Sequence, residues 1–375
     1  MATRRQGRLQ GRMRVLPRAL LRRARSAGRR ARPAQPQRIA IVHHLLLGDT
    51  LQITPLLAKC REQHPLAEIV MTVPAGLAGL YAGRPYGVQA LPFSPGNAAS
   101  LTALMRGAPP DLALVPGDNR HAWLAQAMGA RWIVAFDGDT PGYKNWMVDE
   151  FVLVPAWPWN WGDASALLLP GPAPAAYDPA DWPEPPCAAF DPPVAPYAVF
   201  HLGARNPLRH WQAPKWRALA DWAASRGLHV VWSAGAEEQH LVDEVDPEHR
   251  HANFAGRLDL AQLWHLVKRA GLVVCPDTGI AHLARLTGAP CVTLFGPGSV
   301  ELSGAGAYWG QGPTRAVSVA DVPCRNQDVV FRRHVPGMQR CVRFAPDCTD
   351  NICMQGISIA AVTEAAEGVL RQAAN

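Results

Sequence analysis

Residues 275–284 read Cys-Pro-Asp-Thr-Gly-Ile-Ala-His-Leu-Ala, and they continue the short apolar run 271–275. That run is typical of a buried strand, and Asp277 or Thr278 can cap a helix that follows it. Gly279 would let a ligand approach the backbone closely. A helix that begins directly after a parallel strand offers free N–H groups and a positive dipole end to an anion. We therefore expect a strand, a tight turn and a helix that together bind a phosphate.

The same stretch allows a purely structural interpretation. Thr278 and His282 are four residues apart, so both lie on one face of the predicted helix, near its beginning. Asp277 and His282 could simply satisfy each other in a capped helix, which is a common structural use of Asp. A second strand is predicted over 291–295, and Gly296-Pro297 ends it.

Length and composition indicate a soluble globular protein of two domains. The chain has 375 residues, of which 48% are hydrophobic and 18% charged, and it is too long for a single core. No apolar run approaches the roughly 18 residues that a membrane span needs, and no secretory signal follows the basic beginning. We therefore expect a cytoplasmic protein. Its eight cysteines then indicate thiols or metal ligands, not structural disulfides.

The net charge of +7 is unevenly distributed. Residues 1–38 contain 13 arginines and no acidic residue, so the remainder carries 24 basic and 30 acidic side chains. Residues 1–37 are interpreted as a basic N-terminal arm. It could be an amphipathic helix on anionic lipid at the inner face of the cytoplasmic membrane, a disordered segment that binds polyanions, or a solvated tail. The acidic body argues against a nucleic-acid partner.

Two blocks of alternating strands and helices follow the arm. Strands are predicted over 38–43, 68–73, 88–91, 112–115 and 132–135, and again over 197–201, 228–232, 271–275 and 291–295. This alternation predicts parallel, doubly wound sheets in an N-terminal domain (38–154) and a C-terminal domain (197–356). No Gly-x-Gly-x-x-Gly follows the first strand, which disfavours a dinucleotide cofactor.

Two further segments complete the predicted organisation. Residues 155–196 contain twelve prolines and are interpreted as a Pro/Trp-rich linker whose tryptophans attach it to a domain surface or stack on acceptor sugars. Residues 357–375 have the periodicity of a C-terminal helix, which could cross back to the first domain.

The motif Asp-Thr-Gly-x-x-His-Leu-Ala at 277–284, with Leu-Phe-Gly-Pro at 294–297, resembles the donor-site signature of glycosyltransferase family 9, the heptosyltransferases of the lipopolysaccharide inner core. The resemblance implies an α/β protein of the GT-B type, with two Rossmann-like domains facing a cleft. It further implies an inverting transfer of heptose from ADP-heptose that requires no metal. A lipid-linked or related glycoconjugate acceptor is implied as the partner.

The resemblance assigns the catalytic base to Asp49. Leu47-Gly48-Asp49-Thr50 lies at the predicted turn after the first strand, where the family carries Leu-Gly-Asp. Transfer to a hydroxyl needs a group that removes its proton, and a carboxylate at this edge of the sheet is suited to that task. The structural alternative is that Asp49 only caps the next helix.

The resemblance also implies a diphosphate clamp built from Arg209 and the N–H groups of Thr278 and Gly279. Residues 208–211, Leu-Arg-His-Trp, fill the place of a Lys-x-Trp-Pro element in the family. Arginine in place of lysine keeps the charge and adds a planar fork suited to phosphate.

The remaining donor contacts are implied at three acidic or imidazole side chains. Glu237 ends the Gly-rich turn 233–237 and would contact the sugar or the ribose. Asp277 and His282 would contact sugar hydroxyls and phosphate. Two glutamates at a helix start also suit the helix dipole, which is the structural alternative for Glu237.

Four cysteines near the C-terminus form a candidate metal site. They are Cys324, Cys341, Cys348 and Cys353, in a loop-rich segment over 324–353. Four thiols could hold a structural zinc or iron ion, and some members of the family carry cysteine clusters here. Buried free thiols are the alternative, because the spacing contains no Cys-x-x-Cys pair.

The sequence is also compatible with two other functions. The acceptor could be a protein instead of a glycolipid. The chain could also be a catalytically inactive nucleotide-sugar-binding protein, since Arg209 departs from the family lysine and no proline directly follows Trp211.

Overall fold

The computed structural model describes residues 2–26, 28, 30–345 and 347–374. The chain divides into two compact units. Unit 1 contains Met1–Trp157, Trp161–Ala175 and Val329–Pro336, and unit 2 contains Pro158–Asn160, Ala176–Asp328 and Gly337–Asn375. The predicted basic arm, cysteine-rich loop and C-terminal helix each include positions outside the described residues, namely 1, 27, 29, 346 and 375.

Unit 1 is built on a six-stranded parallel sheet. Its strands are β1 (Arg38–Ile41), β2 (Glu68–Pro74), β3 (Val88–Phe93), β4 (Leu112–Val115), β5 (Trp132–Phe136) and β6 (Glu150–Val152), in the order β3-β2-β1-β4-β5-β6. Its α-helices are α1 (Ala2–Arg25), α2 (Leu47–Gln52), α3 (Thr54–Gln63), α4 (Ala98–Arg106), α5 (His121–Met128) and α6 (Trp161–Ser165). Short 3-10 turns are η1 (Ala75–Tyr81), η2 (Pro85–Gly87), η3 (Gly142–Asn145) and η4 (Ala166–Leu168), and a hairpin is formed by β13 (Val329–Val330) and β14 (Arg333–His334).

Unit 2 repeats this plan. Its strands are β7 (Tyr197–His201), β8 (His229–Ser233), β9 (Ala252–Asn253), β10 (Leu272–Pro276), β11 (Cys291–Phe295) and β12 (Thr314–Ser318), in the order β12-β11-β10-β7-β8-β9 and all parallel. Its helices are η5 (Pro179–Asp181), η6 (Pro207–Arg209), α7 (Ala213–Ala224), α8 (Gln239–Val245), α9 (Leu260–Lys268), α10 (Gly279–Thr287), α11 (Val300–Ser303), α12 (Ile352–Gln355) and α13 (Ile359–Ala374).

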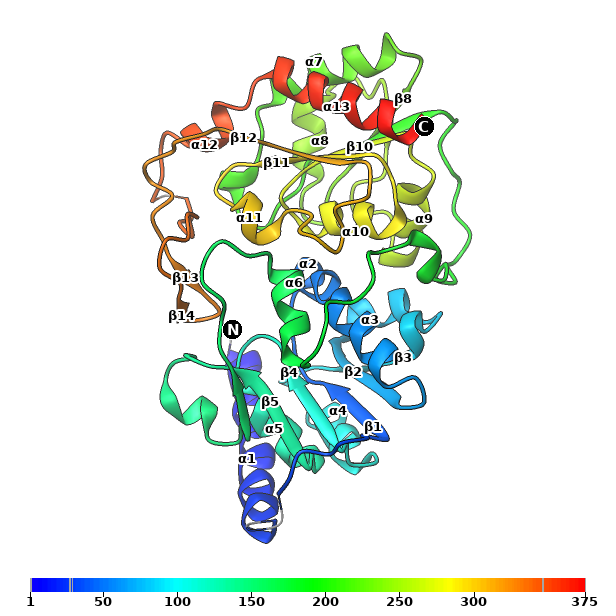
Figure 1. Ribbon diagram of the computed structural model, residues 1–375. Coiled ribbons are helices and arrows are strands. Elements are labelled where there is room, and N and C mark those ends of the chain that lie inside the picture. Colours follow the sequence, from blue (N-terminus) through cyan, green and yellow to red (C-terminus); the bar gives the residue numbers. More distant parts are fainter. Residues whose placement is uncertain (1, 27, 29, 346, 375) are drawn as a thin grey trace. The chain divides into compact units, whose positions relative to one another are not determined.

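The apolar runs explain why these strands form. Every residue of β4, β7, β10 and β11 is buried, as expected for strands covered on both faces. In unit 2, α7, α8 and α13 cover one face of the sheet and α9, α10 and α11 the other (Figure 1). The two sheets confirm the predicted α/β class, and each predicted strand is present within one or two residues of its expected bounds.

Each sheet has one point at which the strand order reverses. It lies between β1 and β4 in unit 1 and between β7 and β10 in unit 2. Ligands of doubly wound sheets bind beyond the carboxyl ends of the strands at this switch point. The predicted base follows β1, and the predicted phosphate loop follows β10. Both candidate halves of the site therefore lie where their own sheet favours ligand binding.

The basic N-terminal segment forms α1, a long helix beside α4 and α5 of unit 1 (Figure 1). Ala19 is fully buried in this contact. Arg18 donates from Nε to the carbonyl of Ala127 (3.0 Å) and from Nη2 to that of Met105 (2.8 Å). It thus places a cation at the C-terminal ends of α5 and α4, where the helix dipoles favour one. Among the described residues, no helix has both the length and the apolar character that a membrane crossing requires.

The proline-rich segment and the C-terminal helix each contact one unit. Trp161, in α6, packs on Phe136 and Phe331 with ring centroids 6.1 and 4.4 Å apart. Trp161 therefore attaches this part of the predicted linker to unit 1. Attachment to a domain surface was one of the two interpretations of the linker tryptophans. α13 packs on β11, β12 and α7 of unit 2 instead of crossing back to unit 1, because its apolar face buries Val362, Ala366 and Val369 in the core of unit 2.

The hairpin 329–336 completes a buried ionic network in unit 1. Asp139, whose side chain is fully buried, accepts the N–H of Asn119 (2.8 Å) and forms an ion pair with Lys144. Lys144 also pairs with Asp118 (2.8 Å). Arg333 donates to Asn119 Oδ1 (2.7 Å) and to the carbonyl of Gly117 (2.9 Å). Asp139 is thus engaged in holding loops together.

Replacing Lys144 should destabilise unit 1 strongly. A Lys144→Met variant keeps the apolar stem but removes the cation closest to buried Asp139, to which Arg333 comes only within 3.9 Å, while Asp118 keeps its pair with Arg120. Breaking a buried pair in this way costs about 3–5 kcal/mol. Urea unfolding, followed by tryptophan fluorescence, measures the loss as a lower midpoint.

The matched control is Lys268→Met. Lys268 pairs with Glu184 at 2.6 Å, but both side chains are well exposed, so the expected cost is only about 0–1 kcal/mol. Equal effects of the two substitutions would contradict a structural role for the buried network.

Candidate active site

The loop between β10 and α10 forms the anion-binding side of the candidate site. Thr278 is the N-cap residue of α10, with extended backbone angles (φ −140°, ψ 177°), yet its side chain makes no capping hydrogen bond. Its Oγ1 is buried and has no hydrogen-bond partner among the described residues. A buried hydroxyl without a partner is costly. The hydroxyl and the first N–H groups of α10 are therefore available to an anionic ligand.

Asp277 is held by Arg209 at the start of this loop. Arg209 Nη1 lies 3.2 Å from Asp277 Oδ2 and also donates to the Asp277 carbonyl. The carboxylate fits against Gly298, where a Cβ would come within 2.2 Å of Oδ2. Arg209 retains 29% exposure of its side chain. Asp277 therefore fixes the position of a guanidinium that still has donors directed to solvent.

His282 lies one turn further along α10, and Arg285 determines which of its nitrogens carries the proton. Arg285 Nη1 donates to His282 Nδ1 at 3.0 Å, and also to the carbonyls of Ser303 (3.0 Å) and Gly304 (2.9 Å). Burial lowers the pKa of His282 well below its usual value, and the charges of Arg285 and Arg209 lower it further. The imidazole is therefore neutral, and it carries its proton on Nε2, because Nδ1 accepts a hydrogen bond.

The loops after β7 and β8 are joined by Glu238 and not by its neighbour Glu237. Glu238 accepts the N–H of Ala204 (3.0 Å) and that of Gly235 (2.7 Å). A Cβ at Gly203 would lie 1.9 Å from Glu238 Oε2, so this close approach needs a glycine. Glu237 is exposed in the preceding turn. The structure therefore places the predicted ribose contact on the surface and the adjacent glutamate inside the loop pair.

Trp211 of the predicted Arg-His-Trp element is part of the unit 2 core. Its Nε1 donates to the carbonyl of Ile357 (3.1 Å), and its ring packs edge-on against Trp216. This contact anchors η6, the short turn that carries Arg209. Because Trp211 is fixed in the core, it also fixes the short turn that carries Arg209.

Asp49 lies at the carboxyl end of β1, in the first turn of α2. The N-cap residue of α2 is Leu46, and Asp49 is half-buried three positions later. Asp49 is therefore not the N-cap, which removes the structural alternative in its simplest form. A carboxylate in the first turn still suits the helix dipole.

His43 immediately precedes this loop and is fully buried. The backbone N–H of His43 donates to Thr72 Oγ1 (2.8 Å), and the ring Nδ1 accepts the backbone N–H of Leu45 (3.2 Å). Burial lowers the pKa of His43 to about 3, with smaller contributions from the charges of His121 and His44. The neutral ring therefore fixes the backbone that leads to Asp49. No sequence motif marks this residue beyond its place after a strand.

The four C-terminal cysteines are all free thiols in unit 2. Burial raises the pKa of the Cys353 thiol, and the charges of Cys324, Cys341 and Cys348 raise it further. The four thiols are therefore close enough to influence one another's ionisation. Within the described part of the chain, however, no three His, Cys, Asp or Glu side chains are close enough to hold a metal ion. The donor set suits zinc or iron, but its present arrangement does not form a coordination shell.

Comparison with known proteins places this geometry in a family. The model of glycosyltransferase family 9 (heptosyltransferase) matches residues 110–308. Lipopolysaccharide heptosyltransferase 1 of Pseudomonas aeruginosa is 25% identical over 311 residues, which cover 76% of this chain and 85% of that protein.

Solved structures agree in fold. The ADP-heptose lipopolysaccharide heptosyltransferase II of E. coli superposes with a TM-score of 0.66 at 19% identity, over 90% of this chain and 100% of that one. The iron-containing dodecameric glycosyltransferase TibC of enterotoxigenic E. coli gives a TM-score of 0.56 at 17% identity, over 92% and 78% of the two chains. These similarities confirm the predicted GT-B fold class.

Acid should destabilise the protein through its buried neutral histidines. The folded pKa of His43 is about 3, below the roughly 6.5 of an unfolded chain. Only the unfolded chain therefore gains this proton between those values. The stabilising contribution is complete above about pH 6.5 and falls by about 1.4 kcal/mol per pH unit below it. A His43→Asn variant, which keeps a hydrogen-bond acceptor, should show a shallower loss in urea unfolding midpoints measured from neutral to acidic pH.

His240→Asn is the control, because His240 is exposed on α8. It should leave the acid profile unchanged. A profile of His43→Asn as steep as that of the unmodified protein would contradict the neutral buried state.

Proposed function

The chain belongs to glycosyltransferase family 9, the heptosyltransferases, and from this we propose that it transfers heptose from ADP-heptose to the lipopolysaccharide core, with Asp49 as the general base. Membership makes it a nucleotide-sugar-dependent glycosyltransferase. The observation that carries the donor assignment is the buried, unpartnered hydroxyl of Thr278 at the beginning of α10.

The donor proposal follows from the charges around that hydroxyl. Arg209 supplies a positioned guanidinium, and α10 supplies unpaired N–H groups and the positive end of its dipole. A leaving diphosphate needs such donors, because negative charge develops on it in the transition state. Neutral His282, with its proton on Nε2, would donate to a phosphate or sugar oxygen without adding a charge. Glu237, exposed in the turn after β8, would contact the sugar or the ribose, and Glu238 would hold that turn in place.

The catalytic proposal rests on the place of Asp49 in unit 1. The residue lies at the carboxyl end of β1, beside the switch point of its sheet, where a bound acceptor is expected. A carboxylate there can remove the proton of the acceptor hydroxyl as it attacks the anomeric carbon. ADP leaves with the electrons of the bond between the anomeric carbon and the phosphate oxygen, so this bond breaks as the glycosidic bond to the acceptor forms. No metal ion is needed for these steps.

The acceptor proposal comes from the relatives. The matched P. aeruginosa protein and the E. coli structure are both described as lipopolysaccharide heptosyltransferases. A lipid-linked acceptor would place this enzyme in the cytoplasm at the inner face of the membrane. A protein acceptor would leave the donor chemistry unchanged.

Asp49→Asn should separate catalysis from donor binding. Loss of the base should lower the transfer rate by about 10²- to 10⁴-fold, while ADP affinity stays nearly unchanged, because Asp49 and the α10 loop belong to different units. Transfer is measured by mass spectrometry of a truncated lipopolysaccharide acceptor, and ADP binding by calorimetry. ADP should bind at least about tenfold more tightly than UDP or GDP, or 1.4 kcal/mol.

Asp181→Asn, an exposed aspartate in η5, is the matched control and should keep full activity. Tighter binding of UDP or GDP would discard ADP-heptose as donor, and sugar found on a protein would discard the glycolipid acceptor. ADP binding without any transfer by the unmodified enzyme would favour an inactive binding protein.

We also propose a structural zinc or iron ion at Cys324, Cys341, Cys348 and Cys353. The support is the set of four neighbouring thiols and the iron content of the structural relative TibC. The segment 324–353 has little regular structure apart from the short hairpin of β13 and β14 and the start of α12. An ion that drew the thiols together would therefore stabilise a region with little core of its own.

Metal analysis of the purified protein should find about one zinc or iron ion per chain. A Cys341→Ser/Cys353→Ser variant should lose it, because thiolates are the ligands both ions favour. Cys187→Ser, an exposed cysteine outside this segment, should retain it. Metal-free protein that still binds ADP would refute this assignment without affecting the proposed transfer reaction.

A further inference from the structure

α1 presents an apolar stripe to its surroundings, and a row of arginines runs along one flank of the helix. The stripe consists of Met13, Leu16, Leu20 and Leu21, which are 60, 38, 51 and 51% exposed. The arginine row consists of Arg14, Arg18, Arg22 and Arg25, whose spacing of three or four residues places them along one flank of the helix. In this row Arg14 and Arg25 are exposed, whereas Arg18 and Arg22 are half-buried beside α4 and α5. Val15 and Ala19 pack against unit 1 on the other side. The helix is thus docked by one face and presents a second amphipathic face to its surroundings.

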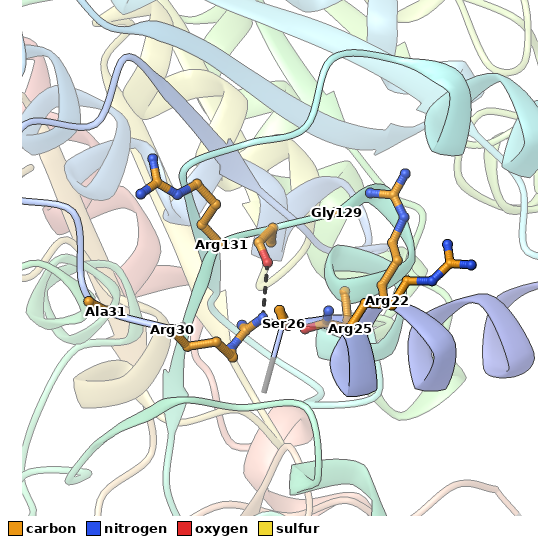
Figure 2. A pocket seen from close by; sticks show the side chains of 9 residues that line it. Arg22, Arg25, Ser26, Arg30, Ala31, Gly129 and Arg131 are labelled. Atoms are coloured by element: carbon orange, nitrogen blue, oxygen red, sulfur yellow. Dashed lines mark hydrogen bonds between the residues drawn. The ribbon is translucent and has the colours of Figure 1, made fainter. Parts of the chain in front are cut away.

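Two cavities open beside the arginine row. One, of about 240 Å³, lies between the end of α1 and the turn from α5 to β5. We call it the arginine pocket, and its charged lining consists of Arg22, Arg25, Arg30 and Arg131 (Figure 2). The other, of about 490 Å³, is lined by Arg14, Arg18 and Arg106 together with apolar Pro17, Leu21 and Met105. Both cavities are therefore lined by several arginines, and Leu21 of the apolar stripe borders the second.

Carboxylates neutralise only part of this charge. Asp149 forms ion pairs with Arg23 and Arg30, and Asp111 lies 3.3 Å from Arg131. Among the described residues, neither Arg22 nor Arg25 is paired with a carboxylate. The arginine pocket therefore has an excess of positive charge that an anion could balance.

Arg22 is held in place although it lacks an anionic partner. Its guanidinium packs so closely on Gly129 that a Cβ there would lie 1.6 Å from Nη1. Gly129 ends α5 in the left-handed conformation (φ 100°), so the guanidinium lies at the negative end of that helix dipole. Burial lowers the pKa of Arg22, and the charge of Arg18 lowers it further. A partly desolvated cation kept in position in this way is typical of an anion-binding site.

We propose that this surface of α1 docks the protein on a bilayer containing anionic phospholipid, with a headgroup phosphate in the arginine pocket and the apolar stripe in the acyl boundary. Charge complementarity selects the phosphate, and exposed leucines on the same helix select a lipid over a purely polar polyanion. A nucleic acid would use the arginines but would leave the leucines in water. The inference rests on the proposed function in one respect only, since a lipid-linked acceptor would be found at such a surface.

Vesicle co-sedimentation of the full chain tests the proposal. The protein should bind vesicles of phosphatidylcholine with phosphatidylglycerol and should bind pure phosphatidylcholine weakly. Arg22→Gln/Arg25→Gln should weaken binding about thirtyfold, or about 2 kcal/mol at about 1 kcal/mol per basic residue. Leu16→Gln/Leu20→Gln should also weaken it, although the charge is unchanged.

Arg315→Gln/Arg371→Gln removes the same charge from exposed positions of unit 2 and should bind like the unmodified protein. If this control lost as much vesicle binding as Arg22→Gln/Arg25→Gln, binding would depend on net charge alone, and the proposed phosphate site in the arginine pocket would be refuted. Tighter binding to an oligonucleotide than to vesicles, with no effect of the leucine substitutions, would make the surface a nucleic-acid site. ADP binding and transfer to a detergent-solubilised acceptor should persist in all three variants, so failed vesicle binding and failed transfer are distinguishable outcomes.

Discussion

The ligand-binding edge of unit 2 depends on the parallel pairing of β7 with β10. Their register aligns Ala198 with Leu272 and Phe200 with Val274, so both strands end at the same level. The chain leaves β7 and β10 in opposite lateral directions at this point, which leaves space beyond the strand ends. Arg209, from the loop after β7, can therefore reach Asp277 after β10. A register shift of one residue would turn every buried side chain of a strand to the other face.

The charged side chains at this edge of the sheet carry a net positive charge. Arg209 and Arg285 are cations, His282 is neutral, and Asp277 supplies the local carboxylate. The helix N-terminus adds further positive potential. A site with this composition stabilises a ligand that carries more than one negative charge. Burial and the charges of the two arginines keep the pKa of His282 low, so its imidazole stays neutral.

The sequence predicts strands much better than side-chain partners. Buried parallel strands are continuous apolar runs, so β4 and β7 could be located to the residue. Glu237 and Glu238 could not be distinguished, because a turn of one residue more or less decides which carboxylate points inward. Docking of α1 was also beyond reach, since Asp149, the partner of Arg23 and Arg30, follows more than a hundred residues later. Asp277, Thr278 and Gly279 could be proposed because they share one predicted strand-to-helix turn, whereas Arg285 lacked any such signal.

The hairpin 329–336 has a consequence for the order in which the protein is made. Unit 1 is assembled from segments that end at residue 175 and from this hairpin, which a ribosome produces only after residues 176–328 of unit 2. Until then, Asn119 Oδ1 and the carbonyl of Gly117 lack the guanidinium of Arg333. The N-terminal half therefore leaves the ribosome with an incomplete loop network, which closes only near the end of translation. A fragment cut within the proline-rich segment would never acquire it.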